Sequence, residues 1–454
     1  MINNKKNRII VIGGNAAGPA AAAKAKRVDK NSEVLLFEAS PYISTGTCEL
    51  PYLLNNTIDD YKKIIFYDDK SFFEDKGVKV FTNTLVDNVN RRNKKILVTD
   101  LITNNSQIYD YDKLVLTTGS YIKPISGLNN RIKNFSTFKT VSDYLKIKEL
   151  FETEKIKNIT IIGAGYTGLE VADTLNELGF DITLIDKNES PVFFADDEIK
   201  ELILNQLAKK SIQFIGNADN LDFIIKDNMV KFVKIFGRAF NTDLVIQTTG
   251  VLPNNYLAAG SQLELGESGA IKVDQKLKTS DYNIYAAGDN IEVMNFISKR
   301  KDYIPLASLA SKYGHIAGSN AAGGNEYISP VIKNVTFKFA DFVYSFVGLS
   351  SKECKNLNIN VKRTIANGNS LIKVMPNNKP VFGKIIRNTN NGTIVGAAFR
   401  GGNEVSSYAD IISVFILNNI KASNLGEINF NYSPPVSPFI NILSVLGQKI
   451  KKEI

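Results

Sequence analysis

Cysteine and histidine are scarce and tryptophan is absent in this sequence of 454 residues, which has two cysteines and one histidine. Two cysteines cannot form a disulfide framework, so we expect a reducing, cytoplasmic compartment. No stretch approaches the ~18 consecutive apolar residues of a membrane span. The polar start, MINNKKNRIIVIGG, has no apolar core of signal-peptide length. We therefore expect neither membrane insertion nor secretion.

A concentrated basic surface is also missing. Lys and Arg number 55 against 46 Asp and Glu, for a net charge of +9, but the basic residues are scattered among asparagines and acids. Because no basic stripe alternates with aromatics, we expect no nucleic-acid partner and interpret the excess as a solvated surface. No metal site is predicted. The length allows roughly three domains.

Two segments share a pattern of strand, glycine turn, helix and strand. Residues 8–13, RIIVIG, form a β-branched run that ends at glycines, an alanine-rich stretch follows, and the apolar run 34–37 ends at Glu38. The pattern returns in residues 159–186, which end at Asp186. Each segment is the βαβ unit of a dinucleotide-binding fold. Because the intervening sequences are unlike, we expect two separate dinucleotide sites rather than a tandem repeat.

The second unit carries the full glycine pattern, GAGYTG. Gly163 permits the tight turn, Gly165 lets the backbone approach a pyrophosphate, and Gly168 allows close packing of helix on strand. The diphosphate would lie on the N–H groups at the helix start. Asp186 would accept hydrogen bonds from a ribose 2′-hydroxyl and repel a 2′-phosphate, which favours NADH over NADPH. Lys187, its neighbour, leaves NADPH open because it could turn toward a phosphate.

The remaining sequence is rich in predicted strands. KVFTNTLVDNV and KKILVTDL lie between the two units, and DLVIQTTGVLPN and YNIYAAGDNIEV follow the second. From about residue 328, apolar residues alternate along VTFKFADFVYSFVGL and NGTIVGAAFRG, which is typical of antiparallel strands. Residues 403–420 and 436–446 are predicted to be helical.

Together with LTTG, TTGVLPN and YAAGD, these segments make the chain resemble the pyridine nucleotide–disulfide oxidoreductases. Within them it is similar to the single-cysteine branch of coenzyme A-disulfide reductases, NADH oxidases and NADH peroxidases. The resemblance implies an α/β chain with two Rossmann-like domains, glutathione reductase-like, plus a C-terminal α+β dimerisation domain, and hence a homodimer. The implied bounds are 1–119 with 250–327 for FAD, 120–249 for NAD(H) and 328–454 for dimerisation.

The resemblance also assigns residues to the two nucleotides. The first unit, GGNAAG, would bind FAD although Asn15 stands where the middle glycine usually is. Asp289 matches the aspartate that bonds the ribityl chain, and Tyr166 matches the tyrosine that covers the flavin until nicotinamide displaces it. The residues expected to bind the cofactors are Gly13, Gly18, Glu38, Thr118, Gly119, Asp289, Leu306, Ala307, Gly163, Gly165, Tyr166, Gly168, Asp186 and Gly250.

The lone cysteine of STGTCELPYLL, Cys48, is the predicted redox centre. Relatives with a dithiol pass electrons to a CxxxxC disulfide, but this chain has no such pair. A single sulfur accepts two electrons only when it is already oxidised, as a mixed disulfide, a persulfide or a sulfenic acid. Cys48 precedes Pro51, which suits a first helical turn, and helix starts favour thiolates. The carboxylate of the neighbouring Glu49 would raise the thiol pKa and so oppose this effect. Cys354 is expected to be inert, on a surface helix.

Other positions distinguish members of the branch. Ala16 stands where peroxidases and oxidases carry a histidine, which favours the disulfide reductases. Tyr432 in NYSPP matches a tyrosine that reaches across the dimer to protonate the departing thiolate, whereas the second such tyrosine is missing from IANGNS. Lys26 and Arg27 fall where relatives bind coenzyme A phosphates. The single histidine, His315, is interpreted as structural.

We therefore expect an FAD- and NADH-dependent enzyme that reduces a low-molecular-weight disulfide or persulfide, with coenzyme A disulfide favoured, through Cys48. One alternative is an NADH oxidase that reduces oxygen through a sulfenate at this cysteine. Another is a flavoprotein sensor without catalysis, which the intact second glycine pattern argues against.

Overall fold

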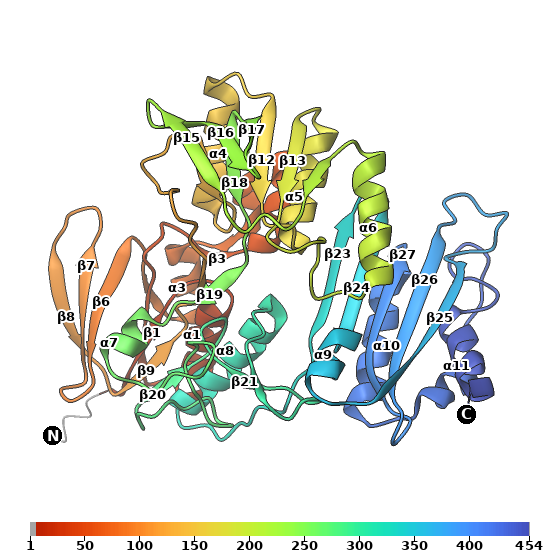
Figure 1. Ribbon diagram of the computed structural model, residues 1–454. Coiled ribbons are helices and arrows are strands. Elements are labelled where there is room, and N and C mark those ends of the chain that lie inside the picture. The colour runs from red at the N-terminus through yellow and green to blue at the C-terminus, as the bar shows by residue number, and fades with distance from the viewer. Residues whose placement is uncertain (1–5, 454) are drawn as a thin grey trace.

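The computed structural model describes residues 6–453, and Figure 1 shows its first parallel sheet beside three antiparallel strands. The sheet has the order β20-β9-β1-β2-β5, and its central strands are buried, as expected of β-branched runs covered on both faces. Helices α1 and α8 pack against each other at this sheet. The elements are β1 (Arg8–Ile12), α1 (Ala17–Val28), β2 (Glu33–Phe37), α3 (Asp69–Lys76), β5 (Lys79–Phe81), β9 (Lys113–Leu116), β20 (Ile284–Ala286) and α8 (Ala307–Ala321).

The second parallel sheet repeats this plan with the order β11-β18-β12-β13-β14. Its core is formed by apolar strands and by the buried faces of the helices beside them. A three-stranded antiparallel sheet, β15-β16-β17, is attached to it (Figure 1). The elements are β11 (Phe135–Thr137), α4 (Val141–Thr153), β12 (Asn158–Ile162), α5 (Tyr166–Glu177), β13 (Asp181–Ile185), α6 (Asp197–Lys209), β14 (Gln213–Ile215), β15 (Asp222–Lys226), β16 (Met229–Ile235), β17 (Arg238–Asn241) and β18 (Leu244–Gln247).

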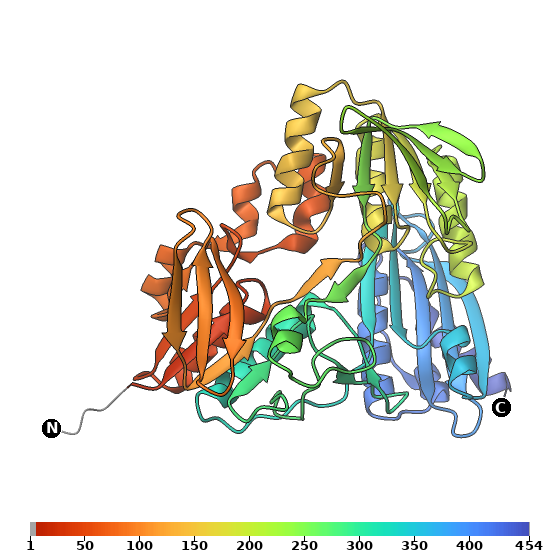
Figure 2. The ribbon, with the colours of Figure 1, turned by 60° about the vertical axis from the view of Figure 1, so that its left-hand side comes forward.

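Two short strands carry the chain from the first parallel sheet to the second and back. β10 (Ser120–Ile122) pairs antiparallel with β19 (Val251–Pro253), and Figure 2 shows the two running side by side between the two parts. Because β20 then joins the first sheet, the second sheet lies within a long insertion between strands of the first.

The C-terminal part is one antiparallel sheet, β23-β24-β27-β26-β25, packed against helices. The strands expected after residue 328 are confirmed, and so is the predicted α/β class with its two parallel sheets. The predicted helix 436–446 is wrong at its start, because Asn441 accepts a hydrogen bond from the Leu443 N–H (2.9 Å) and the helix begins at Ile442. The elements are β23 (Asn334–Phe339), β24 (Phe342–Gly348), α9 (Ser351–Asn356), β25 (Val361–Asn369), β26 (Pro380–Asn388), β27 (Ile394–Gly401), α10 (Glu404–Leu417) and α11 (Ile442–Glu453).

Smaller elements complete the described chain. Two two-stranded sheets and one three-stranded sheet border the first parallel sheet, and short helices lie near them. Within residues 6–453, no helix combines the length and apolarity needed to cross a membrane. The elements are β3 (Ile43–Thr45), α2 (Leu50–Leu54), β4 (Ile65–Tyr67), β6 (Thr84–Asn90), β7 (Lys95–Asp100), β8 (Ser106–Asp110), α7 (Tyr256–Gly260), β21 (Val293–Met294) and β22 (Lys301–Asp302).

A buried lysine joins the second parallel part to the C-terminal sheet. The Lys384 side chain on β26 is fully buried, and its Nζ lies 2.7 Å from Asp196 and 2.6 Å from Glu198, at the start of α6. Asp196 also accepts hydrogen bonds from the main-chain N–H and the hydroxyl of Ser351, both at 2.9 Å. Charges removed from water are tolerated when they are paired in this way, so this contact fixes where α6 meets the sheet.

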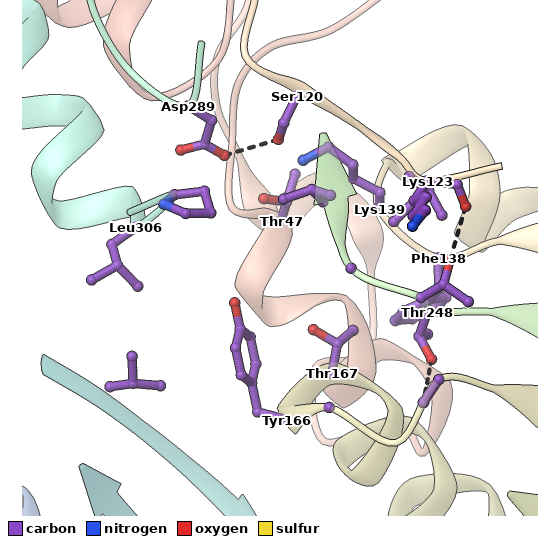
Figure 3. A pocket seen from close by; sticks show the side chains of 18 of the residues that line it. Thr47, Ser120, Lys123, Phe138, Lys139, Tyr166, Thr167, Thr248, Asp289 and Leu306 are labelled. Atoms are coloured by element: carbon purple, nitrogen blue, oxygen red, sulfur yellow. Dashed lines mark hydrogen bonds between the residues drawn. The ribbon is translucent and has the colours of Figure 1, made fainter. Parts of the chain in front are cut away.

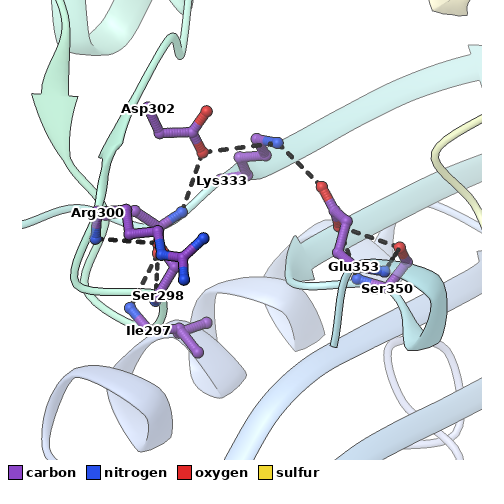
Figure 4. A network of polar contacts seen from close by, with 8 residues as sticks. Ile297, Ser298, Arg300, Asp302, Lys333, Ser350 and Glu353 are labelled. Atoms are coloured by element: carbon purple, nitrogen blue, oxygen red, sulfur yellow. Dashed lines mark hydrogen bonds and ion pairs between the residues drawn. The ribbon is translucent and has the colours of Figure 1, made fainter. Parts of the chain in front are cut away.

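A second ion-pair network joins the first part to the C-terminal sheet (Figure 4). Lys333 lies 3.7 Å from Asp302, at the end of β22, and 3.1 Å from Glu353 on α9. Glu353 in turn accepts a hydrogen bond from the Ser350 N–H (2.8 Å). Both nucleotide-fold parts are therefore attached by charge to the same sheet.

We predict that Lys384→Met destabilises the protein by about 3–5 kcal/mol, because it leaves the buried carboxylate of Asp196 and the partly exposed one of Glu198 without their cation. Denaturant unfolding followed by circular dichroism would measure this loss. The matched control is Lys362→Met, which removes a half-exposed lysine 3.5 Å from Glu453 and should cost no more than about 1 kcal/mol. Equal effects of the two substitutions would contradict the assigned role of Lys384.

Candidate active site

A cavity of about 1590 Å³ runs from the end of the first parallel sheet to the end of the second. Gly13 and Gly14, which follow β1, line one end of it, and Gly163 and Gly165, which follow β12, line the other. Cys48 lines the wall of the same cavity. Ligands of open α/β sheets bind at the carboxyl ends of the strands, which is where both ends of this cavity lie.

The first glycine turn is shaped so that no side chain fits. Gly13 has φ +108°, and a Cβ there would lie 2.1 Å from the Thr117 carbonyl oxygen. At Gly18 a Cβ would lie 1.7 Å from the carbonyl oxygen of Gly13, so the start of α1 rests directly on the end of β1. Asn15, in the middle position, is exposed and lines the cavity.

Glu38 holds the first turn from the adjacent strand. Its carboxylate accepts hydrogen bonds from the N–H groups of Gly14 (2.5 Å) and Ser40 (2.7 Å), and it lines the cavity. Glu38 is therefore the acid expected at the end of β2, and its carboxylate lies beside the glycine turn.

The second glycine turn has the same geometry. Gly163 has φ +111° and leaves a Cβ only 2.4 Å from the Thr248 carbonyl oxygen, while a Cβ at Gly168 would lie 1.9 Å from the carbonyl oxygen of Gly163. A Cβ at Gly165 would meet nothing within 4 Å, so the backbone there faces open space. Asp186 accepts hydrogen bonds from the N–H groups of Ala164 (2.7 Å) and Asn188 (2.8 Å).

Between the two turns the cavity is lined by the residues that the sequence assigned to the flavin (Figure 3). Asp289 accepts a hydrogen bond from the Ser120 hydroxyl (3.0 Å), and burial raises the pKa of its carboxyl. The Tyr166 side chain projects from the start of α5 toward Leu306, which immediately precedes α8. The other lining residues from the predicted set are Thr118, Gly119, Gly250 and Ala307.

Cys48 lies in a short 3₁₀ turn, Thr47–Glu49, immediately before α2, with Pro51 in the first turn of that helix. The thiol is exposed toward the cavity. Burial by the surrounding protein raises the pKa of the Cys48 thiol, the carboxylates of Glu49, Glu170 and Asp289 raise it further, and Lys139 lowers it. These effects outweigh the lowering of the thiol pKa that was expected from the helix start. The expected effect of Glu49, which raises this pKa, is confirmed.

Cys354 lies on α9, a helix at the surface as expected, whose neighbouring residues Lys352, Lys355 and Asn356 are exposed. Its own side chain is completely buried on the inner face of that helix, against Leu349, Ile386 and Val395. Burial raises the pKa of this thiol to about 12, with further contributions from Glu353 and Asp196. Burial therefore keeps the thiol inert.

Five of the predicted residues do not line the cavity: Gly18 and Gly168, which lie where each helix packs on its strand, and Lys26, Arg27 and Tyr432. Lys26 donates hydrogen bonds from Nζ to the carbonyl oxygens of Lys30 (2.8 Å) and Ser32 (2.7 Å), which fastens the end of α1. Arg27 is exposed on the same helix. Tyr432 is 45% exposed in the segment before α11, with its ring edge against Phe439.

Sequence reasoning missed two cavity residues, Glu170 and Tyr52. Burial raises the pKa of the Glu170 carboxyl to about 7, while hydrogen bonds from the Lys338 main chain and the Tyr52 side chain oppose this rise. Both residues line the cavity. Both residues could have been found from their spacing to predicted site residues. Glu170 follows Tyr166 by four residues, one helical turn, in IIGAGYTGLE. Tyr52 follows Cys48 by four residues in CELPY.

Family models match almost the whole chain. The model described as pyridine nucleotide-disulphide oxidoreductase matches residues 7–314, and the dimerisation domain of the same family matches residues 335–441. The chain belongs to the pyridine nucleotide-disulphide oxidoreductase family. The resemblance noted in the sequence is thereby confirmed, as are the enzyme class and the arrangement of two Rossmann-like parts with a C-terminal dimerisation domain.

Individual relatives are similar along nearly the whole of this chain. The chain is 30% identical to an NADH oxidase of Methanocaldococcus jannaschii, covering 98% of this chain and 99% of the relative. It is 27% identical to a coenzyme A disulfide reductase of Staphylococcus aureus, covering 98% and 100%. The solved structure of an NAD-dependent persulfide reductase from A. fulgidus superposes with a TM-score of 0.93 at 28% identity, covering 98% of this chain and 83% of that one.

Family membership implies FAD and a nicotinamide nucleotide, and the described residues fit both. Gly13, Gly18, Gly163 and Gly168 leave no room for side chains beside the two helix starts, where N–H groups attract a pyrophosphate. The open space at Gly165 allows a phosphate to approach the backbone. One cavity joins both places, so two nucleotides would meet between them.

We predict that a thiol reagent modifies Cys48 but not Cys354 in the folded protein, because the first side chain is exposed and the second is buried. The rate at Cys48 should still rise with pH above the ordinary thiol range, since its pKa is raised. Mass spectrometry of peptides after timed alkylation would measure both rates, and unfolding should make both cysteines reactive. Faster modification of Cys354 than of Cys48 would contradict the structure.

Proposed function

We propose that this chain is an FAD-dependent NAD(P)H oxidoreductase that reduces a low-molecular-weight disulfide or persulfide, with coenzyme A disulfide the favoured substrate. The observation that carries the proposal is the position of Cys48 on the wall of the cavity that also holds both glycine turns. The second cysteine is buried on α9 and unavailable as a partner thiol. A relative named coenzyme A disulfide reductase and a structure titled persulfide reductase support this substrate class.

In this mechanism bound FAD supplies a two-electron carrier between the nicotinamide and an oxidised sulfur. Gly13, Gly18 and Glu38 would hold its adenosine and pyrophosphate end, and Asp289 would bond its ribityl chain. The Cys48 sulfur attacks one sulfur of the incoming disulfide or persulfide, forms a new S–S bond and releases a thiolate or hydrosulfide. Tyr166 would shield the flavin position until the nicotinamide arrives.

We further propose a homodimer in which Tyr432 acts at the site of the other copy. The C-terminal part matches a dimerisation-domain model, which supports association of two copies. Tyr432 does not line the cavity of its own chain, whereas the same segment exposes Val436, Phe439 and Ile440. Burial of these apolar side chains would favour an interface there. The nucleotide assignments 1–119 with 250–327 for FAD and 120–249 for NAD(H) form part of the same proposal.

A second candidate is an NADH oxidase that reduces oxygen through a sulfenate at Cys48. The relative from M. jannaschii that carries this name favours it. Ala16, which lines the cavity, offers no proton donor where the oxidases and peroxidases of the branch have a histidine. A sensor without catalysis is the remaining alternative, and failure of NADH to reduce the bound flavin would favour it.

We predict that NADH-dependent turnover of coenzyme A disulfide or a persulfide exceeds oxygen consumption, and that Cys48→Ser abolishes disulfide turnover. Anaerobic reduction of the flavin by NADH should survive this substitution, because both glycine turns are unchanged. Steady-state assays with coenzyme A disulfide, cystine, polysulfide and oxygen, followed by anaerobic flavin spectra, would test this. The matched control is Cys354→Ser. Rapid oxygen uptake without turnover of any sulfur substrate would favour the oxidase instead.

We predict a preference for NADH that depends on Asp186, whose carboxylate would bind the ribose 2′-hydroxyl and repel a 2′-phosphate. Asp186→Ser should raise the ratio of kcat/KM for NADPH over NADH by about tenfold, equivalent to about 1.4 kcal/mol. The companion variant Lys187→Ala tests whether Lys187, rather than Asp186, sets this ratio. If this second variant, and not the first, changes the ratio, the assignment to Asp186 is wrong.

A further inference from the structure

A partly buried acid lines the same cavity as Cys48 and is not used in the mechanism above. Glu170 is on α5, one helical turn after Tyr166, and its side chain lines the cavity. Tyr52 is on α2, four residues after Cys48, which lies in the 3₁₀ turn before that helix, and α2 packs against α5. Tyr166 and Glu170, four residues apart, share one face of α5, and Cys48, Tyr52, Tyr166 and Glu170 all line the same cavity.

The charges of these groups act on one another. Burial raises the pKa of the Cys48 thiol and of Tyr166, and the Glu170 carboxylate raises both further. Burial, then the charge of Glu170 and hydrogen bonding to it, raise the pKa of Tyr52 to about 12. A tyrosine that stays protonated acts as a donor, so the Tyr52 hydroxyl favours the carboxylate form of Glu170.

Acid–base chemistry near neutral pH needs a suitable group in this cavity, and histidine does not supply it. The single histidine, His315, is exposed on α8 and does not line the cavity. Burial places the pKa of Glu170 at about 7, where a carboxyl group both accepts and returns protons efficiently. No cation is among the causes that set this pKa, unlike that of Cys48, which Lys139 lowers.

We propose that Glu170 is the proton acceptor and donor for Cys48 during thiol–disulfide exchange, and that Tyr52 positions its carboxylate. This role rests on the proposed function, because it serves attack of Cys48 on a disulfide. It also differs from a role in which Glu170 only orients bound nucleotide, since that role would not link its proton to the thiol.

The steps balance without any further reactant. The Glu170 carboxylate takes the proton of the Cys48 thiol, and the resulting thiolate attacks a disulfide RS–SR. The RS–SR bond breaks as the Cys48–S–SR bond forms, and the departing RS⁻ takes the proton from Glu170 to leave as RSH. Glu170 returns to its carboxylate form. The two electrons that later free Cys48 come from NAD(P)H through FAD.

Two carboxyl groups besides Glu170 affect the same thiol. Glu49 follows Cys48 in its own turn, and Asp289 acts from the loop before β21, while Lys139 opposes them from the residue before the Thr140 cap of α4. Because these charges remain in a Glu170 variant, a change in the titration of Cys48 would report on Glu170 itself.

The first experiment measures alkylation of Cys48 by iodoacetamide against pH, in the holoenzyme with oxidised flavin and no NADH. Glu170→Gln removes a negative charge near the thiol, so the midpoint of the rate profile should move to lower pH than in the wild type. The matched control, Glu177→Gln, makes the same change at a half-exposed position on α5, 3.5 Å from Lys210, and should leave the midpoint unchanged.

The second experiment measures the pH profile of kcat/KM for coenzyme A disulfide. The wild type should gain activity as the pH rises through about 7, because the carboxylate is the form that accepts the thiol proton. Glu170→Gln should lose this limb and at least about tenfold in rate at neutral pH. Tyr52→Phe removes a hydrogen bond that favours the carboxylate, so the limb should move to higher pH.

An unchanged alkylation midpoint in Glu170→Gln, or a retained limb near pH 7, would overturn the proton role. If Glu170→Gln does not fold, an unshifted limb in Tyr52→Phe would overturn it instead. A role limited to nucleotide orientation would slow anaerobic flavin reduction by NADH in Glu170→Gln and leave the limb near pH 7 in place. Failure of the wild type to turn over any disulfide would defeat the proposed function, while the alkylation profile would still test the coupling of Glu170 to Cys48.

Discussion

The active site depends on two places where a helix starts too close to a strand for any side chain to lie between them. A Cβ at Gly18 would stand 1.7 Å from the Gly13 oxygen, and one at Gly168 would stand 1.9 Å from the Gly163 oxygen. This contact directs the free N–H groups of both helix starts into one cavity, at the carboxyl ends of two parallel sheets. Cys48 lies between them, so any redox chemistry of its sulfur takes place where two nucleotides would meet.

The charges around Cys48 make a resting thiolate harder to form. Burial and three carboxylates raise the thiol pKa, and one lysine, Lys139, acts in the opposite direction. The adjoining helix α2 has only five residues, so its dipole is a weak counterweight. A reactive sulfur here therefore needs a group that removes its proton when substrate is present. The buried carboxyl of Glu170 has a pKa suited to that task, whereas a structural ion pair would have kept it ionised.

Local patterns in the sequence predicted most of the fold, because each βαβ unit lies within about 30 residues. The helix after Cys48 was expected from Pro51, whereas the redox role of Cys48 was expected from the resemblance to the family and from the lack of a CxxxxC pair. Contacts between distant segments were not predictable. Lys384 meets Asp196 across almost two hundred residues, and only the folded chain shows that both are buried. Lys26 was predicted as a phosphate ligand from the family resemblance, and no local signal showed that its Nζ also fastens the end of α1.

The C-terminal sheet helps to determine how the two nucleotide-fold parts face each other, together with α2, which packs against α4 and α5. Two short strands, β10 and β19, carry the chain between those parts, which leaves little sheet to fix their orientation. Lys384 ties α6 to this sheet on one side, and Lys333 ties the β21–β22 hairpin to it on the other. The sheet also contributes Val347 and Ala397 to the cavity wall. The element that matches the dimerisation domain therefore borders the cavity and contacts both nucleotide-fold parts, so a dimer formed through it would be built on part of the cavity wall.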